Sequence, residues 1–289
     1  MEPGVGWETG MGNYANLAGL DVGDGHPVRI VGAMNVSPES FYRGSVALDG
    51  DTLRRRAERM AAEGADMLDI GAMATAPYLE TAVSEVEEIR RLTWAIEVLR
   101  SAVALPISVD TSRSCVASAA LDAGAAVIND VGGFRRDPAM AKLAAERSRG
   151  AILMASETSP GATEPVVTVR TLLQQSLALA DAAGVPRDRI VLDPGIGFFR
   201  KAAVSWDRWD CEMLRHLGSL RTLGQPVLVG LSRKSFIGKI LGRQDPVERL
   251  HGSLAATTVA VLNGTHLVRT HDVGPTRDAI RMAEALRSM

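Results

Sequence analysis

Three acidic side chains of this chain each follow a short apolar run, at the point where a buried strand would end: Asp69, Asp110 and Asp193. A carboxylate in a poorly solvated place costs free energy unless something pairs with it. A heterocycle with adjacent N–H donors is a suitable partner, because one carboxylate can accept two parallel hydrogen bonds. Any one of these acids alone would more often cap a helix or form an internal salt bridge. Three of them at equivalent positions favour a shared binding pocket.

Two asparagines, Asn35 and Asn129, also follow apolar runs. An amide side chain donates and accepts hydrogen bonds at once, which suits a fused nitrogen heterocycle or a metal-bound phosphate. A turn explains either asparagine taken singly. Asn35 also opens a Ser- and Pro-containing loop, residues 35–41, of the kind that can close over a ligand. A Mg²⁺ ion that arrives with a diphosphate needs only one or two protein oxygens, and Asn35 can supply one.

Basic side chains gather at two further positions. The segment Gly230–Gly238 leads from an apolar run into two cations and two hydroxyls at an expected helix N-terminus. These residues are Ser232, Arg233, Lys234 and Ser235. This arrangement favours an anion over a surface charge cluster, although it lacks the spacing of a Walker loop. The last apolar run leads in the same way to Arg269 and His271.

The elements that must position these residues are eight apolar runs with helical periodicity between them. The runs are Val28–Met34, Asp66–Leu68, Ile107–Val109, Ala126–Ile128, Ala151–Met154, Ile190–Leu192, Val227–Leu231 and Leu267–Val268. Eight strand–helix units predict a closed parallel (β/α)8 barrel, the TIM barrel, whose active site lies at the carboxyl ends of the strands. A doubly wound open sheet is the structural alternative. In such barrels phosphate often binds after strands seven and eight, where both basic clusters fall.

The alternation of predicted strands and helices also sets the domain boundaries. Residues 28–289 form one barrel domain, and residues 1–27 form a glycine-rich leader without a clear period, which we expect to cover one mouth of the barrel. We expect helices to end at the glycines that precede strands, because glycine tolerates the left-handed conformation. These are Gly64, Gly124, Gly150, Gly184, Gly224 and Gly264.

Composition limits the classes of function. A formal net charge of −2 argues against broad electrostatic binding of nucleic acid, and no apolar stretch reaches membrane-spanning length. We see no signal peptide, and two cysteines, Cys115 and Cys211, form no disulfide framework or zinc pattern. The remaining histidines have no zinc-protease spacing. A reduced, cytoplasmic enzyme is the expected setting.

At this point the sequence resembles the dihydropteroate synthase family, from about residue 28 to residue 287. The resemblance rests on seven separated motifs in order. They are Met34–Phe41, Gly64–Gly71, Ser108–Thr111, Val127–Val131, Asp193–Phe198, Gly230–Phe236 and Arg269–Val273. Members of this family join a dihydropterin-CH2-diphosphate to an aromatic amine and release diphosphate. They also pair through the last two helices, which implies a homodimer.

The resemblance implies a role for each polar residue that follows a predicted strand. Asp110, Asn129, Asp193 and Lys234 would hold the pterin, and Asp110 would also stabilise the cation that forms as diphosphate leaves. Further contacts of the pterin, the diphosphate or the leaving group would come from Asn35, Thr75, Met154, Phe198, Ser232, Arg269 and His271. Of these, Arg269 and His271 would act catalytically with Asp110 and Lys234, and magnesium would bind at Asn35.

The chain departs from the bacterial pattern on the side of the amine. Ala76 and Tyr78 replace an arginine and a glycine of the second loop, Arg43 replaces an acid of the first, and Ala155 replaces a histidine. The natural amine is therefore p-aminobenzoate or, as in archaeal-type members with similar loops, a ribofuranosyl-aminobenzene phosphate. A non-catalytic pterin-binding paralogue and a corrinoid-linked methyltransferase domain remain as alternatives, although the second does not need the two basic clusters.

Overall fold

The computed structural model describes residues 12–37, 49–73, 83–156 and 160–287. Within them, eight parallel strands pair in the order β8-β7-β6-β5-β4-β3-β10-β9. One parallel bridge, between Leu192 and Val227, joins β8 to β9 and closes the ring. The strands are β3 (Arg29–Asn35), β4 (Met67–Gly71), β5 (Ile107–Asp110), β6 (Val127–Asp130), β7 (Ala151–Met154), β8 (Ile190–Asp193), β9 (Leu228–Gly230) and β10 (Leu267–Thr270). Each predicted apolar run coincides with one strand, so the prediction of a (β/α)8 barrel is confirmed.

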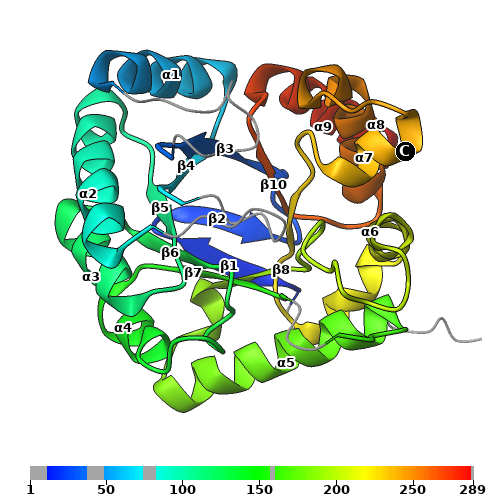
Figure 1. Ribbon diagram of the computed structural model, residues 1–289, viewed down its shortest axis with the longest axis horizontal. Helices are drawn as coiled ribbons and strands as arrows, with labels where there is room; N and C mark the ends of the chain where they lie inside the picture. Colours follow the sequence, from blue (N-terminus) through cyan, green and yellow to red (C-terminus); the bar gives the residue numbers. More distant parts are fainter. Residues whose placement is uncertain (1–11, 38–48, 74–82, 157–159, 288–289) are drawn as a thin grey trace, which may run out of the picture.

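Helices surround the ring of strands on the outside (Figure 1). The α-helices are α1 (Gly50–Glu63), α2 (Glu85–Ala102), α3 (Ser114–Ala123), α4 (Met140–Arg147), α5 (Pro165–Ala183), α6 (Trp206–Arg215), α7 (Ser235–Leu241), α8 (Leu250–Leu262) and α9 (Val273–Arg287). Short 3-10 helices are η2 (Arg187–Arg189), η3 (Leu217–Leu223) and η4 (Pro246–Arg249). Two helices, α7 and α8, follow β9, so α7 is a short extra helix near the strand ends. None of the helices described is long and apolar enough to cross a bilayer.

Glycines end several helices as the sequence predicts. Gly64, Gly124, Gly184 and Gly224 are left-handed C-caps that donate their amides to the last turn. The prediction is wrong for Gly150, because α4 already ends at Ser148. A Cβ at Gly150 would lie 2.6 Å from Cδ2 of Leu17, so this glycine instead makes room for the N-terminal segment.

That segment forms an antiparallel hairpin of β1 (Tyr14–Leu17) and β2 (Leu20–Gly23), which differs from the expected leader without regular structure. Ala15, Leu17 and Val22 are buried in a small core inside the barrel. The rest of this core comes from residues near the starts of seven strands: Val31, Met67, Val127, Ile152, Val191, Leu228 and Leu267. The hairpin therefore closes the mouth at the amino ends of the strands, and Figure 1 shows it in blue in the middle of the ring.

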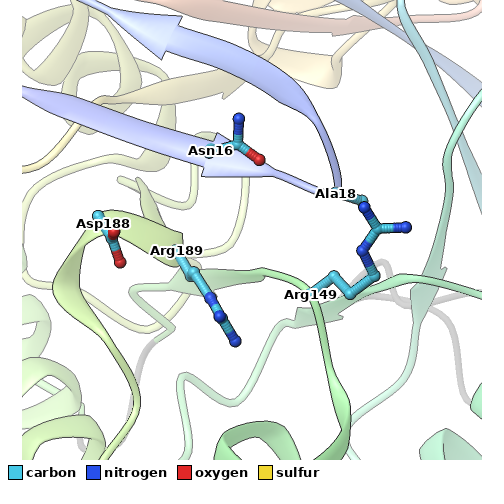
Figure 2. A pocket seen from close by; sticks show the side chains of 5 residues that line it. All are labelled: Asn16, Ala18, Arg149, Asp188 and Arg189. Atoms are coloured by element: carbon cyan, nitrogen blue, oxygen red, sulfur yellow. The ribbon is translucent and has the colours of Figure 1, made fainter.

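A pocket of about 300 Å³ opens beside the hairpin turn, as Figure 2 shows. It is lined by Asn16, Ala18, Arg149, Asp188 and Arg189. Arg149 lies two residues before β7 and Arg189 directly precedes β8, which places the pocket at the amino ends of these strands. In this architecture that end contributes stability, whereas chemistry is located at the opposite end.

Candidate functional site

Polar side chains at five strand ends are joined to one another around Asp69. Its Oδ2 accepts hydrogen bonds from Nδ2 of Asn129 and from Nη1 of Arg269, both at 3.0 Å. Its Oδ1 accepts a hydrogen bond from the Ser108 hydroxyl. Nη2 of Arg269 also lies 3.7 Å from Oδ2 of Asp193. Strands β4, β5, β6, β8 and β10 thus contribute to one polar centre, which extends from Ser108 within β5 to Asp193 at the carboxyl end of β8.

Two acceptor atoms in this centre are buried without a hydrogen-bond partner among the residues that the structure describes: Oδ1 of Asp110 and Oδ1 of Asn129. Nδ2 of Asn129 donates one hydrogen bond to Asp69, whereas its Oδ1 accepts none from the described residues. An unsatisfied buried acceptor costs about 1–3 kcal/mol. Both atoms therefore indicate a ligand that brings its own N–H donors.

Burial shifts the protonation of these groups. It raises the pKa of Asp110 to about 7, with a further contribution from the charge of Asp69. Burial also raises the pKa of Asp193, against the opposing effect of Arg269. Burial and the charge of Arg269 lower the pKa of Lys234 to about 8. Strongly shifted titratable groups that meet at one strand-end cluster are typical of a functional site.

The turn after β8 lies against Lys234, which follows β9. Nζ of Lys234 lies 4.7 Å from the centroid of the Phe198 ring, a cation–π contact. A Cβ at Gly195 would lie 2.0 Å from the carbonyl oxygen of Ala155 and 3.5 Å from Cγ of Met154. Because Gly195 has a φ of +71°, only glycine fits this close approach, and the turn lies directly against the end of β7.

The two basic clusters meet between β9 and β10. The backbone N–H of His271 donates to the Ser232 hydroxyl at 3.3 Å, and Nδ1 of His271 donates to the Ala33 carbonyl at 3.0 Å. Burial lowers the pKa of His271 to about 4, so its imidazole is neutral at pH 7. The loops after the neighbouring strands β9 and β10 therefore come together, as the sequence predicts.

Arg233 differs from the prediction that it contributes to an anion site. Its Nε and Nη2 donate to the carboxylate of Asp272 at 2.9 and 2.8 Å. Its Nη1 donates to the backbone carbonyls of Pro246 and Val247. The buried guanidinium thus connects the loop after β9 to η4 and to the start of α9.

Asn35 lies next to Asp110 across Gly71. A Cβ at Gly71 would lie 3.5 Å from Oδ1 of Asn35 and 3.8 Å from Oδ2 of Asp110. In the described ranges no three His, Cys, Asp or Glu side chains come close enough together to hold a metal. Two neighbouring hard oxygens fit a magnesium ion that takes its other ligands from substrate and water.

Several predictions fall on residues outside the described ranges. These are Thr75, Ala76, Tyr78 and Arg43, together with most of the loop that Asn35 opens. Ala155, the remaining departure on the side of the amine, lies in the described ranges, and its backbone N–H donates to the Asp193 carbonyl at 2.8 Å.

Two residues near the site are absent from the sequence prediction. Asp210 is buried on α6 and accepts a hydrogen bond from the Gly197 amide at 2.8 Å. Arg200 donates to the Gly197 carbonyl and to the Ser235 hydroxyl, and it lies 4.1 Å from the centroid of the Trp206 ring. The available signal for Asp210 is an acid on the face of α6 that also carries Trp209 and Met213.

Comparison with known proteins gives one consistent result. A family model described as pterin binding enzyme matches residues 31–271. The dihydropteroate synthase of Synechocystis sp. is 38% identical over 264 residues, which cover 89% of each chain. A probable bifunctional folylpolyglutamate synthase/dihydropteroate synthase of Halobacterium salinarum is 37% identical, and the match covers 92% of this chain and 32% of that protein.

Solved structures agree. A Coxiella burnetii dihydropteroate synthase in complex with pteroic acid superposes with a TM-score of 0.85 at 36% identity, covering 96% of this chain and 99% of that one. The Xanthomonas albilineans enzyme with 4-aminobenzoic acid gives a TM-score of 0.85 at 37% identity, with the same coverage.

Proposed function

Because the chain belongs to the pterin-binding enzymes, we propose that it acts as a dihydropteroate synthase. In this reaction (7,8-dihydropterin-6-yl)methyl diphosphate is joined to p-aminobenzoate and diphosphate is released. The observation that carries the proposal is the pair of buried, unsatisfied acceptors on Asp110 and Asn129, at the same strand ends as Asp193 and Lys234. A pterin offers several N–H donors and one ring carbonyl, and these four side chains complement it.

The proposed roles in binding follow from hydrogen-bonding capacity. Asp193 and Asn129 accept from the nitrogen-rich edge of the ring, and the Lys234 ammonium donates to the carbonyl side. Met154, whose Cγ lies close to Gly195, provides an apolar contact for the face of the ring. Phe198 lies under the Lys234 ammonium and restricts its position.

The chemical step separates charge. The C–O bond to diphosphate breaks with its electron pair on the leaving group, and positive charge spreads over the pterin. Asp110 would stabilise that cation, and Arg269 and His271 would stabilise the leaving anion. The neutral amine then attacks the methylene and loses a proton. Separate stabilisation of cation and anion at one rim makes a covalent enzyme intermediate unnecessary.

Magnesium belongs to the same proposal. Asn35, with Asp110 beside it, would hold a Mg²⁺ ion that arrives with the diphosphate, and the ion would supply charge neutralisation of the leaving group. Calorimetry measures the binding of inorganic diphosphate with and without Mg²⁺ and so tests the proposed magnesium site. Asn35→Ala should remove most of the magnesium-dependent gain in affinity.

The test of the reaction is a mass spectrum of the product. Purified protein is incubated with the pterin diphosphate and Mg²⁺, together with p-aminobenzoate or the ribofuranosyl-aminobenzene phosphate. We expect dihydropteroate and stoichiometric diphosphate with p-aminobenzoate. Turnover with the phosphorylated amine alone would replace the acceptor, and no diphosphate release with any amine would contradict the enzyme proposal.

A matched variant tests the ring-binding part. Asp193→Ala removes a charged acceptor from a buried site, which costs roughly 1.5–3 kcal/mol or more, about a tenfold to hundredfold loss of pterin affinity. Asp188→Ala, at the opposite end of the barrel, should bind pterin like the wild type. Unchanged affinity in Asp193→Ala would show that the ring lies elsewhere.

We also propose a homodimer that pairs through α8 and α9. Large apolar side chains are exposed on these two helices: Val259, Leu262, Met282 and Leu286. The two helices pack against each other, and their exposed apolar side chains are the surface that we propose receives a second copy. This matches the end of the barrel that the family resemblance implies.

A reducing, cytoplasmic setting is the last part of the proposal. Cys115 and Cys211 are both free and exposed. Exposed thiols without disulfide partners are typical of proteins that work in a reducing compartment.

A further inference from the structure

Helix α6 buries an acid that the proposed reaction does not use. Asp210 is fully buried beside Trp209 and Met213, where a carboxylate needs partners to stay ionised. Its Oδ1 accepts a hydrogen bond from the Gly197 amide at 2.8 Å. Its Oδ2 is buried and makes no hydrogen bond with any described residue. Burial raises the pKa of this carboxyl to about 6.

Gly197 lies between Asp210 and Lys234. A Cβ at Gly197 would be 3.2 Å from Cδ of Lys234 and 3.4 Å from its Nζ, so the turn directly supports the lysine side chain. Asp193 holds the same turn from the other side, because its Oδ1 accepts from the Gly195 amide at 2.8 Å. Two buried carboxylates therefore fix the two glycine amides of the turn that contacts Lys234.

The charges around Lys234 come from four elements. Asp193 on β8 and Asp210 on α6 favour the ammonium, whereas Arg269 on β10 and Arg200 after β8 oppose it. Burial is the largest influence and also favours the neutral amine. Asp210 in turn faces Lys234, Arg200 and Asp207. Loss of either acid should let Lys234 lose its proton closer to neutral pH.

We propose that Asp210 is a positioning residue for Lys234: it fixes the turn at Gly197, and its negative charge keeps the Lys234 ammonium protonated while that ammonium holds the pterin. The role in ligand binding rests on the proposed function. Asp210 itself touches no substrate, and its effect passes through the turn and the lysine.

The first test follows binding of pteroic acid by calorimetry from pH 6 to pH 10. Asp210→Asn keeps the size of the side chain and an oxygen for the Gly197 amide but removes the charge. We expect its dissociation constant at pH 8 to rise about three- to tenfold, with convergence on the wild type at pH 6. The ligand's own titration is common to both proteins. Glu212→Gln, a surface residue of the same helix, should follow the wild-type curve.

Superposable curves for wild type and Asp210→Asn would overturn the proposal. A reciprocal measurement needs no ligand: in Lys234→Met, the ¹³C NMR signal of the Asp210 carboxyl should titrate at higher pH than in the wild type. An unchanged midpoint there would also overturn it. Failure of the wild type to bind pteroic acid would instead contradict the proposed function, while the NMR comparison would still decide the coupling.

Discussion

At the scale of single residues, the site holds buried charge that weakens the fold. The pKa of Asp110 is raised to about 7 by burial and by Asp69. The folded protein therefore binds more protons than the unfolded chain between about pH 4 and pH 7, and stability falls as the pH rises through that window. Burial of the Asp110 carboxylate, which we propose stabilises the pterin cation, therefore lowers the free energy of unfolding at neutral pH.

This predicts a stabilising substitution that impairs activity. Asp110→Asn should raise the midpoint of thermal unfolding by roughly 2–6 °C at pH 8 and by little at pH 4, where the aspartic acid is already protonated. Differential scanning calorimetry at both pH values measures the difference. Activity should fall at the same time, since an amide cannot neutralise the pterin cation. Equal unfolding midpoints for the wild type and Asp110→Asn at pH 8 would mean that the Asp110 carboxylate does not destabilise the folded protein.

The sequence predicts that these polar residues come together but not which of them form hydrogen bonds with one another. The position of Asn129 after an apolar run placed it at the strand ends, yet its hydrogen bond to Asp69 depends on a partner 60 positions away. The position of Arg233 after β9 suggested an anion contact, and only the tertiary structure shows that Asp272 binds its guanidinium. Asp210 could not be predicted from the strand pattern because it lies on helix α6 and not at a strand end.

At the scale of elements, the sequence predicts the strands and the helix ends that depend on nearby residues alone. Buried parallel strands appear as short apolar runs, and left-handed glycines end helices, so both could be predicted. The hairpin could not, because its two four-residue strands lie in a glycine-rich segment and their stability comes from packing inside the barrel. Gly150 was misassigned for the same reason, since the space it leaves is for Leu17.

The hairpin should therefore contribute to the stability of the whole barrel. Leu17 is fully buried, and Leu17→Ala should lower the free energy of unfolding by about 2–5 kcal/mol. Urea denaturation followed by circular dichroism gives this value. Leu179→Ala, at an exposed position of α5, is the matched control and should change stability by less than about 0.5 kcal/mol. A similarly small effect of Leu17→Ala would mean that the barrel does not depend on the hairpin.

At the scale of the whole molecule, the exposed apolar region on α8 and α9 predicts a dimer. Sedimentation velocity at micromolar concentration should give twice the chain mass, and Met282→Asp should shift the protein to monomer by placing a charge in the interface. Val86→Asp changes an exposed apolar residue on α2 and should leave the mass unchanged. A monomer in the wild type contradicts pairing through these helices.

The closure of the barrel has a further consequence. Strands β8 and β9 are joined by the single bridge between Leu192 and Val227, whereas their other neighbours pair along the strand. Asp193 ends β8, and Lys234 follows β9, so the two side chains proposed to hold different parts of the pterin lie on either side of this bridge. A bound pterin would connect β8 and β9 where the barrel has the fewest strand–strand contacts. Substrate would thus complete the barrel around its own binding site.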